Sequence, residues 1–133
     1  MKLKNLAIIL TVFFLAVSCA STVYIPENLS SAEIIQLAQE ASDRNRYSVS
    51  LQYYEAILQR FPHDMNSICA AEYEIAFIHY KQGRFDLARE GFNNLLERYD
   101  NPDGILLPQQ FRILSNIVLQ RMDEIESARR RRR

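Results

Sequence analysis

Few side chains in this sequence could carry out nucleophilic or acid-base chemistry. The histidines are His63 and His79, and Cys69 is the one cysteine outside the N-terminal region. Cys69 and His79 would form a thiol-imidazole pair if they met, but ten residues along one helix separate them by about 15 Å. We therefore interpret His79 as a helix-surface or half-buried residue and His63 as part of a turn after Pro62.

Two groups of carboxylates could act as acid pairs: Glu72 with Glu74, and Asp123 with Glu124 and Glu126. Residues two apart on a helix point to different sides, so we interpret both groups as solvated faces. The sequence has no metal-ligand spacing and no phosphate-binding loop. We therefore expect no catalytic residue, no metal, no cofactor and no small-molecule substrate. The protein is accordingly predicted not to be an enzyme.

The charged residues are unevenly distributed along a chain whose 133 residues fit one domain. The 16 basic residues balance the 16 acidic ones, but Lys2, Lys4 and residues 129–133 account for seven of the basic ones. An acidic body argues against a nucleic-acid-binding surface. The basic run at residues 129–133 has two interpretations: a solvated, disordered tail, or a segment that binds membrane phosphates or an acidic partner.

The N-terminus has the features of an export signal. Two lysines precede a 12-residue uncharged apolar run at Leu6 to Val17, which is too short to span a bilayer stably. Leu15-Ala16-Val17-Ser18-Cys19 resembles a bacterial lipobox, although Ala16 stands where the strictest form has Leu. The resemblance implies a signal peptide over residues 1–18, lipidation of Cys19 and a lipid-anchored tether over residues 19–29. An uncleaved anchor extending to Ile25 and simple secretion are the alternatives.

All three alternatives export the body of the protein. Ala20, and not Asp, follows Cys19, which by resemblance to known lipoprotein sorting implies the outer membrane of a bacterial cell envelope. Lipidation would leave Cys69 without a disulfide partner. Cys69 is then either a reactive thiol or a small core residue, and its apolar neighbours favour the core.

The region from residue 30 to residue 128 is predicted to be all-α. Ser30 and Glu33 form a capping-box pattern before a helix over about residues 31–44, and a second helix with apolar helical spacing follows from Tyr47 to Phe61. A third helix over residues 67–82, apolar on most sides, should be buried between neighbours. A fourth is expected over residues 85–99, and a fifth begins near Pro108.

A shift of 38 residues superposes the chain on itself. It carries Ala38 onto Ala76, Tyr54 onto Phe92, and Asn45 onto Gly83. Asn and Gly are the two residue types that most readily adopt the left-handed conformation that closes a helix. The spacing of Ala76, Gly83, Phe85, Ala88 and Phe92 resembles the tetratricopeptide repeat. The usual period of that motif is shorter by about four residues. The resemblance implies a short α-α solenoid of about two and a half helical hairpins.

The same resemblance implies a binding surface along the first helix of each hairpin. In this sequence the matching positions are Ile35, Gln39 and Ser42, then Tyr73, Phe77 and Tyr80, then Phe111, Ser115 and Val118. The aromatic face either anchors a peptide or partner helix, or fills core between helices. We therefore expect either a scaffold for protein partners in the cell envelope or a purely structural lipoprotein tethered to a membrane.

Overall fold

The computed structural model describes residues 22–132, and this part of the chain is all-helical. Within it lie five α-helices, one 3-10 helix and no β-strand, which confirms the predicted all-α class. The predicted signal peptide, the predicted lipidation site Cys19 and the terminal Arg133 lie outside the described residues. None of the helices in residues 22–132 is long and apolar enough to cross a bilayer.

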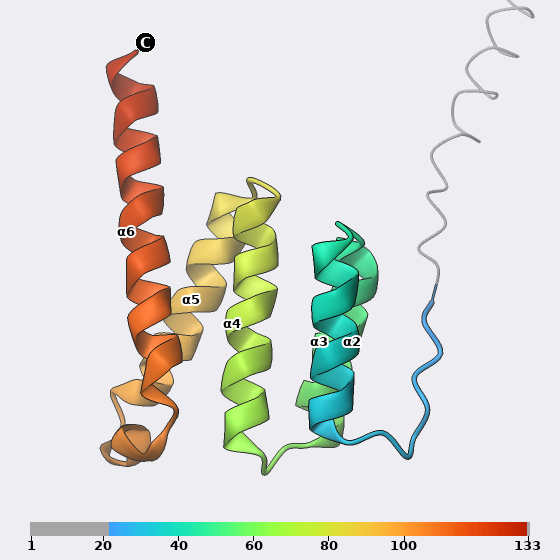
Figure 1. The fold of residues 1–133 in the computed structure, drawn as a ribbon. Coiled ribbons are helices and arrows are strands. Elements are labelled where there is room, and N and C mark those ends of the chain that lie inside the picture. The colour runs from blue at the N-terminus through green and yellow to red at the C-terminus, as the bar shows by residue number, and fades with distance from the viewer. Residues whose placement is uncertain (1–21, 133) are drawn as a thin grey trace, which may run out of the picture.

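The helices form two layers (Figure 1). Their bounds are α2 Ser31–Asp43, α3 Tyr47–Arg60, α4 Met65–Lys81, α5 Phe85–Tyr99, η1 Pro102–Leu106 and α6 Gln109–Arg131. α2, α4 and α6 lie in one layer, and α3 and α5 lie behind them. α2 pairs with α3 and α4 pairs with α5, so residues 22–132 contain two helical hairpins followed by α6, which packs against α5 and α4.

The two hairpin turns have the same backbone geometry. Asn45 has φ of 57° and Gly83 has φ of 72°, so both adopt the left-handed conformation that the sequence predicts. In each turn the next residue donates its N–H to a carbonyl five residues earlier, at 2.8 Å in the first turn and 2.9 Å in the second. The 38-residue shift therefore relates two turns of the same type.

Side-chain caps fix where two of the helices begin. The predicted capping box at α2 is confirmed, because Ser30 and Glu33 exchange side-chain and backbone hydrogen bonds. The predicted start of α4 at Ser67 is two residues late. Asp64 caps this helix by accepting hydrogen bonds from the Ser67 N–H at 3.1 Å and hydroxyl at 2.6 Å. Asp64 also accepts the Ser31 hydroxyl at 2.8 Å, which ties the start of α2 to the start of α4.

Two hydrophobic clusters fill the space between the helices. One lies around the first hairpin and reaches α4; its buried members are Ile34, Ala38, Tyr54, Ile57, Ala71 and Ile78. The other lies among α4, α5 and α6; its buried members are Cys69, Tyr73, Ala76, Ala88, Phe92, Leu95, Tyr99, Val118 and Met122. α4 contributes to both clusters, which confirms its predicted position between neighbours.

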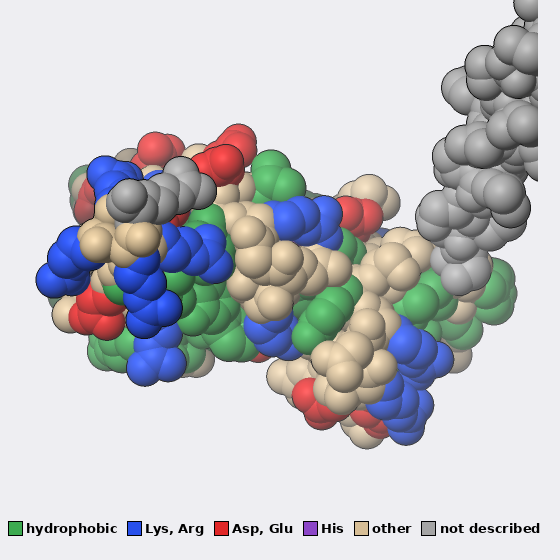
Figure 2. Space-filling view, turned by 90° about the horizontal axis from the view of Figure 1, so that it is seen from above, with side chains coloured by type: hydrophobic (Ala, Val, Ile, Leu, Met, Phe, Trp, Pro, Cys, Tyr) green, Lys and Arg blue, Asp and Glu red, His purple; other side chains and the backbone are tan. Residues whose placement is uncertain are grey.

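The last helix begins near Pro108 as predicted, but it differs from expectation in its C-terminal extent and in an exposed apolar face. It continues through Arg131, so the first three residues of the basic run are helical rather than a disordered tail. Figure 2, which looks down on this end of the molecule, shows Lys and Arg side chains gathered around it. Toward its start, Ile113 is 59% exposed, Leu114 39% and Ile117 54%, and these residues form an apolar face that no described helix covers.

Candidate functional site

An aromatic ladder runs along α4 to the start of α5. Its members are Tyr73, Phe77, Tyr80 and Phe85, and each ring stacks on the next with centroids 5.7 Å apart and interplanar angles of 13° to 20°. Three of them occupy i, i+4 and i+7 positions of α4, as the sequence predicts for one helix face. These distances and angles are typical of favourable offset stacking between aromatic side chains, which restricts the motion of the rings.

Burial decreases along the aromatic ladder. Tyr73 is 7% exposed and its ring packs against Phe92 and Phe111, with centroids 5.6 and 5.7 Å away. Burial raises the pKa of Tyr73 to about 12, so its hydroxyl stays protonated at neutral pH. Phe77 and Tyr80 are only half-buried. Tyr73 is therefore a packing residue between α4 and α6, whereas Phe77 and Tyr80 keep surface that another molecule can touch.

A hollow of about 290 Å³ opens beside Phe77 on the layer that contains α2 and α4. It is lined by Gln39, Ser42, Asp43, Glu74, Phe77 and Lys81. Gln39, Ser42 and Phe77 were predicted to share this surface, and the structure brings them together. The charged members of the lining were not predicted, because their spacing along the sequence forms no motif.

Lys81 occupies a fixed position in this hollow. Its Nζ donates to the Ser42 hydroxyl at 2.6 Å and lies 5.1 Å above the Tyr47 ring and 5.3 Å above the Phe77 ring. Cation-π contacts with two rings hold the ammonium group at the edge of the aromatic ladder. The hollow therefore offers an apolar ring and a positive charge side by side.

Glu74 adds a carboxylate to the hollow. Burial raises its pKa above the ordinary 4.5, and Asp43 raises it further, while Lys81 opposes the shift. The prediction that Glu74 lies on a solvated face is therefore wrong, because this side chain is half-buried. Its orientation follows from the contact of α2 with α4, which sequence spacing along α4 cannot reveal.

The remaining groove positions divide between surface and core. Ile35 packs half-buried against the first cluster, Phe111 packs half-buried against the second, and Gln39 is exposed. Ser42 is 6% exposed, Ser115 is 0% exposed and Val118 is 7% exposed. The predicted groove positions on α6 therefore pack against α4 and α5. The part of the predicted surface that remains open lies between α2 and α4.

The candidate nucleophile and base have no catalytic arrangement. Cys69 is fully buried in the second cluster, and burial raises the pKa of its thiol, so it is protonated at neutral pH. The core interpretation of Cys69 is confirmed. His79 is half-buried, as predicted, and burial followed by the charge of Arg84 lowers the pKa of its imidazole. No group of three His, Cys, Asp or Glu side chains within residues 22–132 could hold a metal ion.

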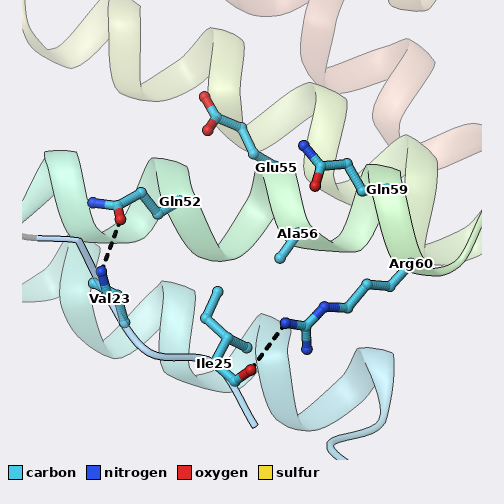
Figure 3. A pocket seen from close by; sticks show the side chains of 7 residues that line it. All are labelled: Val23, Ile25, Gln52, Glu55, Ala56, Gln59 and Arg60. Carbon is cyan, nitrogen blue, oxygen red and sulfur yellow. Dashed lines mark hydrogen bonds between the residues drawn. The ribbon is translucent and has the colours of Figure 1, made fainter. Parts of the chain in front are cut away.

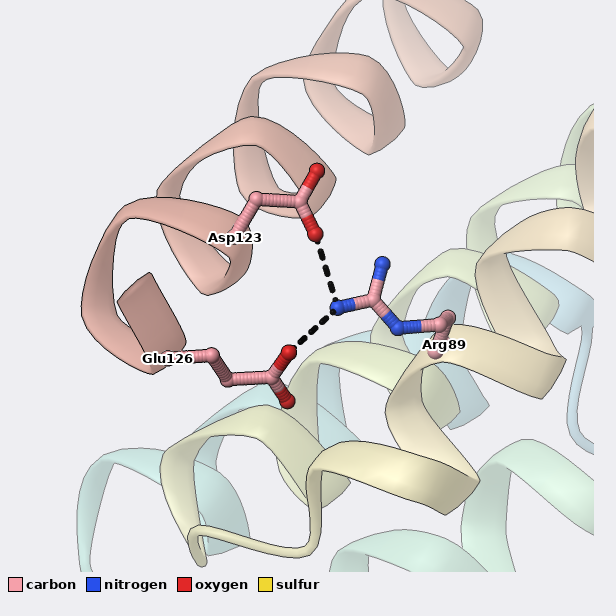
Figure 4. Close-up of polar contacts among 3 residues, drawn as sticks. All are labelled: Arg89, Asp123 and Glu126. Carbon is pink, nitrogen blue, oxygen red and sulfur yellow. Dashed lines mark hydrogen bonds and ion pairs between the residues drawn. The ribbon is translucent and has the colours of Figure 1, made fainter. Parts of the chain in front are cut away.

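Three of the carboxylates flagged in the sequence form ion pairs between helices. Glu72 on α4 binds Arg98 on α5 through two hydrogen bonds of 2.7 and 2.6 Å. Arg89 on α5 lies between Asp123 and Glu126 of α6, at 2.9 and 3.2 Å (Figure 4). These carboxylates therefore join neighbouring helices. Asp123 is exposed, as expected for a solvated face, whereas Glu72 and Glu126 are half-buried.

The segment before α2 lies along α3 as a strap, defined here as residues 22–29. Val23 N–H donates to Gln52 Oε1 at 2.9 Å, and the Arg60 guanidinium donates to the Ile25 carbonyl at 2.9 Å (Figure 3). The same guanidinium donates to the Pro26 carbonyl, also at 2.9 Å. Ile25 and the neighbouring Leu29 also pack against the first cluster. The described part of the predicted tether is therefore attached to the helical body.

The chain is similar to a protein of known sequence whose function has not been assigned. No family model matches the chain, and no solved structure matches it. An uncharacterized protein of Treponema pallidum (strain Nichols) is 32% identical over 117 residues, which are 86% of this chain and 46% of that protein. The chain thus spans about half the length of the relative, whose description names no activity, ligand or partner.

Proposed function

We propose that the protein is a non-catalytic, lipid-anchored binding module of a bacterial cell envelope. In this proposal a tetratricopeptide-like array of two and a half hairpins presents the surface between α2 and α4 to another protein. The lipid would be carried by Cys19, on the strength of the lipobox-like sequence before it. The observation that carries the binding role is the half-exposed part of the aromatic ladder beside the charged hollow.

The repeat assignment is supported by features that recur at the 38-residue shift. Both hairpin turns use a left-handed residue, and each hairpin places a fully buried alanine of its first helix, Ala38 or Ala76, in its core. The second helix of each hairpin has a fully buried small residue at matching positions, Ser50 and Ala88. Small residues at these positions allow the paired helices to approach closely. Stacked units of this kind characteristically form extended binding surfaces.

The composition of the surface indicates what kind of partner it would hold. Phe77 and Tyr80 give rigid apolar area, Lys81 gives a positive charge, and Gln39 gives hydrogen-bonding groups. A helix or extended peptide with an apolar side chain next to hydrogen-bonding groups would complement this arrangement, because the lining holds the carboxyl groups of Asp43 and Glu74 as well as Lys81. The partner would therefore be a protein segment rather than a small polar metabolite.

A purely structural lipoprotein is the second candidate function. The burial of Tyr73 and its contacts with Phe92 and Phe111 favour it, because they show that part of the aromatic face is core. The two candidates differ in one measurable respect. A structural tether needs no saturable partner, whereas a binding module does.

Phe77→Ala tests the binding role, and Leu87→Ala on α5 is the matched control. Leu87 is 45% exposed and lies outside the hollow, so both variants remove apolar surface from a partly exposed position. We expect both proteins to fold, with Phe77→Ala losing less than about 3 kcal/mol of unfolding free energy because its ring is half-buried. Only Phe77→Ala should lose capture of a protein partner from solubilised envelopes.

The outcome that contradicts the binding role is specific. If Phe77→Ala melts as a core variant does, with a loss of about 3 to 5 kcal/mol, and still retains its partner when folded at low temperature, the surface has no role in binding. Capture that is absent for the wild-type protein at all concentrations would favour the structural tether.

Mass spectrometry of the native protein tests the anchor separately. A mature N-terminal diacylglyceryl-cysteine at Cys19 is the expected result, since stable anchoring takes two or more acyl chains. Detection of an intact Met1, or of a soluble product cleaved elsewhere, would refute lipidation. Neither result depends on the capture experiment.

A further inference from the structure

Basic side chains gather at one end of the helical layers. The α2–α3 turn, the α4–α5 turn and the last turn of α6 all lie at the upper end of the molecule (Figure 1). Their residues 43–46, 81–86 and 129–132 include two acidic side chains, Asp43 and Asp86, and eight basic ones. The eight are Arg44, Arg46, Lys81, Arg84, Arg129, Arg130, Arg131 and Arg132, and they are here named the basic end.

The opposite end of the layers has the reverse balance. Its residues 27–33, 60–65 and 98–112 contain five acidic side chains and three basic ones. Two of the three basic side chains are engaged, because Arg60 binds the strap carbonyls and Arg98 binds Glu72. Arg112 is the remaining one. The molecule is therefore electrically polar along its helix axes.

The arginine side chains of the basic end are available to an external anion. All eight basic residues are exposed, but the Lys81 ammonium is held in the hollow by the Ser42 hydroxyl. Among the seven arginines, the carboxylate paired within residues 22–132 is Glu40, at 4.0 Å from Arg44. Arg129 lies 5.3 Å from the Phe85 ring, so its side chain reaches the start of α5, while the last turn of α6 projects beyond the α4–α5 turn (Figure 1). Figure 2 shows that Lys and Arg side chains gather at the end of α6 and recur in separate groups across the same face.

The strap runs toward this same end. Ile25 and Pro26 are held by Arg60, the last residue of α3, whereas Val23 is held by Gln52, nearer the start of that helix. Gln52 lies five residues after the start of α3, or about 8 Å along its axis. Val23 is four residues from Cys19, which limits the chain between them to about 14 Å.

We propose that the basic end lies against an anionic membrane surface and binds the phosphates of its phospholipid headgroups. This proposal rests on the lipid anchor of the proposed function, because the chain between Val23 and Cys19 is long enough for an acyl group on Cys19 to meet the same membrane as the basic end. The anchor and the basic end would then engage the same bilayer, and the helices would stand upright on it. The acidic end would face away from the membrane, and the hollow between α2 and α4, which contains Lys81 of the basic end, would open beside the membrane surface toward a protein partner.

Two charge reversals at opposite ends test this orientation. Arg46→Glu alters the basic end and Arg112→Glu alters the opposite end by the same charge, and both side chains are exposed. The full chain is added to preformed phosphatidylcholine vesicles with or without phosphatidylglycerol, and the bound fraction is measured by sedimentation. At low salt, Arg46→Glu should weaken binding to the anionic vesicles at least about fivefold, while Arg112→Glu leaves it unchanged.

Salt and lipid charge supply the controls for this measurement. The effect of Arg46→Glu should vanish at high salt and on vesicles of phosphatidylcholine alone, because screening removes a surface electrostatic attraction. Equal losses for the two variants, or equal binding to charged and uncharged vesicles, would overturn the proposal. Unchanged vesicle binding would also overturn it, even if the same end retained an acidic protein.

A second measurement uses the acylated protein itself. A donor fluorophore is attached at Gln82→Cys in the basic end or at Gln110→Cys in the opposite end, with the acceptor on a lipid headgroup. The 17-residue α4 spans about 25 Å, so energy transfer from position 82 should exceed that from position 110 severalfold. Equal transfer from the two positions would refute the upright orientation.

The two experiments separate this proposal from the lipid anchor. If mass spectrometry finds no acyl chains, the anchor fails, but the difference between Arg46→Glu and Arg112→Glu on anionic vesicles should remain. If acylation is present and that difference is absent, the anchor stands and the role of the basic end fails.

Discussion

The two hairpins share a backbone plan but differ in the side chains that fill it. The cluster around α2 and α3 is mainly aliphatic, with Ile34, Ile57 and Ile78 at its centre. The cluster around α4 and α5 is more aromatic and continues into the aromatic ladder. The first hairpin is flanked by the strap, whereas the second is flanked by α6.

This difference shows what the repeat requires and what it leaves free. Turn residues with positive φ and small residues at the helix contacts recur in both hairpins, because backbone geometry demands them. The larger residues need only fill volume, so they have diverged. In the second hairpin the surplus of aromatic side chains extends to the surface, and this is where the binding role is proposed.

The largest expected effect comes from breaking the close contact of the second hairpin. Ala88 is fully buried, so Ala88→Asp would bury a carboxylate without a partner and should remove at least about 4 kcal/mol of unfolding free energy. Thermal unfolding measures the loss. Glu90→Ala, at an exposed position of the same helix, is the control and should be nearly silent; equal melting temperatures would show that the repeat register is wrong.

A smaller effect should follow where the two hairpins differ most in side-chain size. A Cβ atom added to Gly91 would lie 2.8 Å from the Cβ of Ala76, whereas the matching position of the first hairpin holds Tyr53. Gly91→Ala should therefore destabilise by about 1 kcal/mol, as overpacking outweighs the gain in helix propensity.

The exposed Asn94 of the same helix provides the control for that substitution. Asn94→Ala should stabilise the protein slightly, because only helix propensity changes there. Chemical denaturation of both variants gives the comparison. Stabilisation by Gly91→Ala as well would show that α4 and α5 can move apart without loss.

Exchanging the small residues Ser50 and Ala88 tests whether they occupy structurally equivalent positions in the two hairpins. The Ser50 hydroxyl donates to the Ala38 carbonyl at 2.8 Å, so Ser50→Ala should cost about 1 kcal/mol. In the second hairpin, Ala88→Ser should be nearly neutral, because the hydroxyl would find the Ala76 carbonyl at the equivalent place. Ala88→Cys lacks a strong donor and should be less stable than Ala88→Ser; the reverse order in denaturation curves would count against equivalence.

The smallest expected effect concerns pH and the hollow between the hairpins. The pKa of Glu74 is raised by burial, so the folded state retains a proton that the unfolded state releases above pH 4.5, and stability falls as pH rises through that window. Glu74→Gln should therefore be stabilising relative to wild type at neutral pH, and this advantage should disappear below pH 4.5.

Asp64 provides a control of opposite sign. Hydrogen bonds from Ser67 and Ser31 lower its pKa below 3.8, so its contribution is present above that pH and is lost as pH falls through the lowered value. Asp64→Asn should thus be destabilising at neutral pH and converge with wild type in acid. Denaturation curves across pH that move both variants in the same direction would contradict the assignment of the two carboxylates.

The sequence predicts helices well wherever apolar spacing and local caps agree. The ends of α2, α3 and α5 lie within a residue of their predicted places, because the left-handed turns and Pro62 are local signals. The start of α4 was missed because its cap, Asp64, precedes the apolar run. The strap could not be predicted, since Arg60 and the Pro26 carbonyl are 34 residues apart and no periodicity joins them.

The candidate site was predictable only in part, for a related reason. Helical spacing places Tyr73, Phe77 and Tyr80 on one face of α4, but their exposure depends on how closely Phe111 of α6 approaches. The charges of the hollow come from α2 and α4 together, so neither helix alone reveals them. Sequence spacing defines a face, and packing between helices decides how much of it remains open.

The strap also determines how a mechanical load would enter the protein. A pull applied before residue 22 would first meet the bond between Val23 and Gln52, and then the two bonds from Arg60 to the Ile25 and Pro26 carbonyls. These contacts lie along α3, so they would open one after another rather than share the force. The pulling force would therefore reach the first hairpin only after the contacts of the strap have broken. The strap would thus be the first part of the body to detach under load.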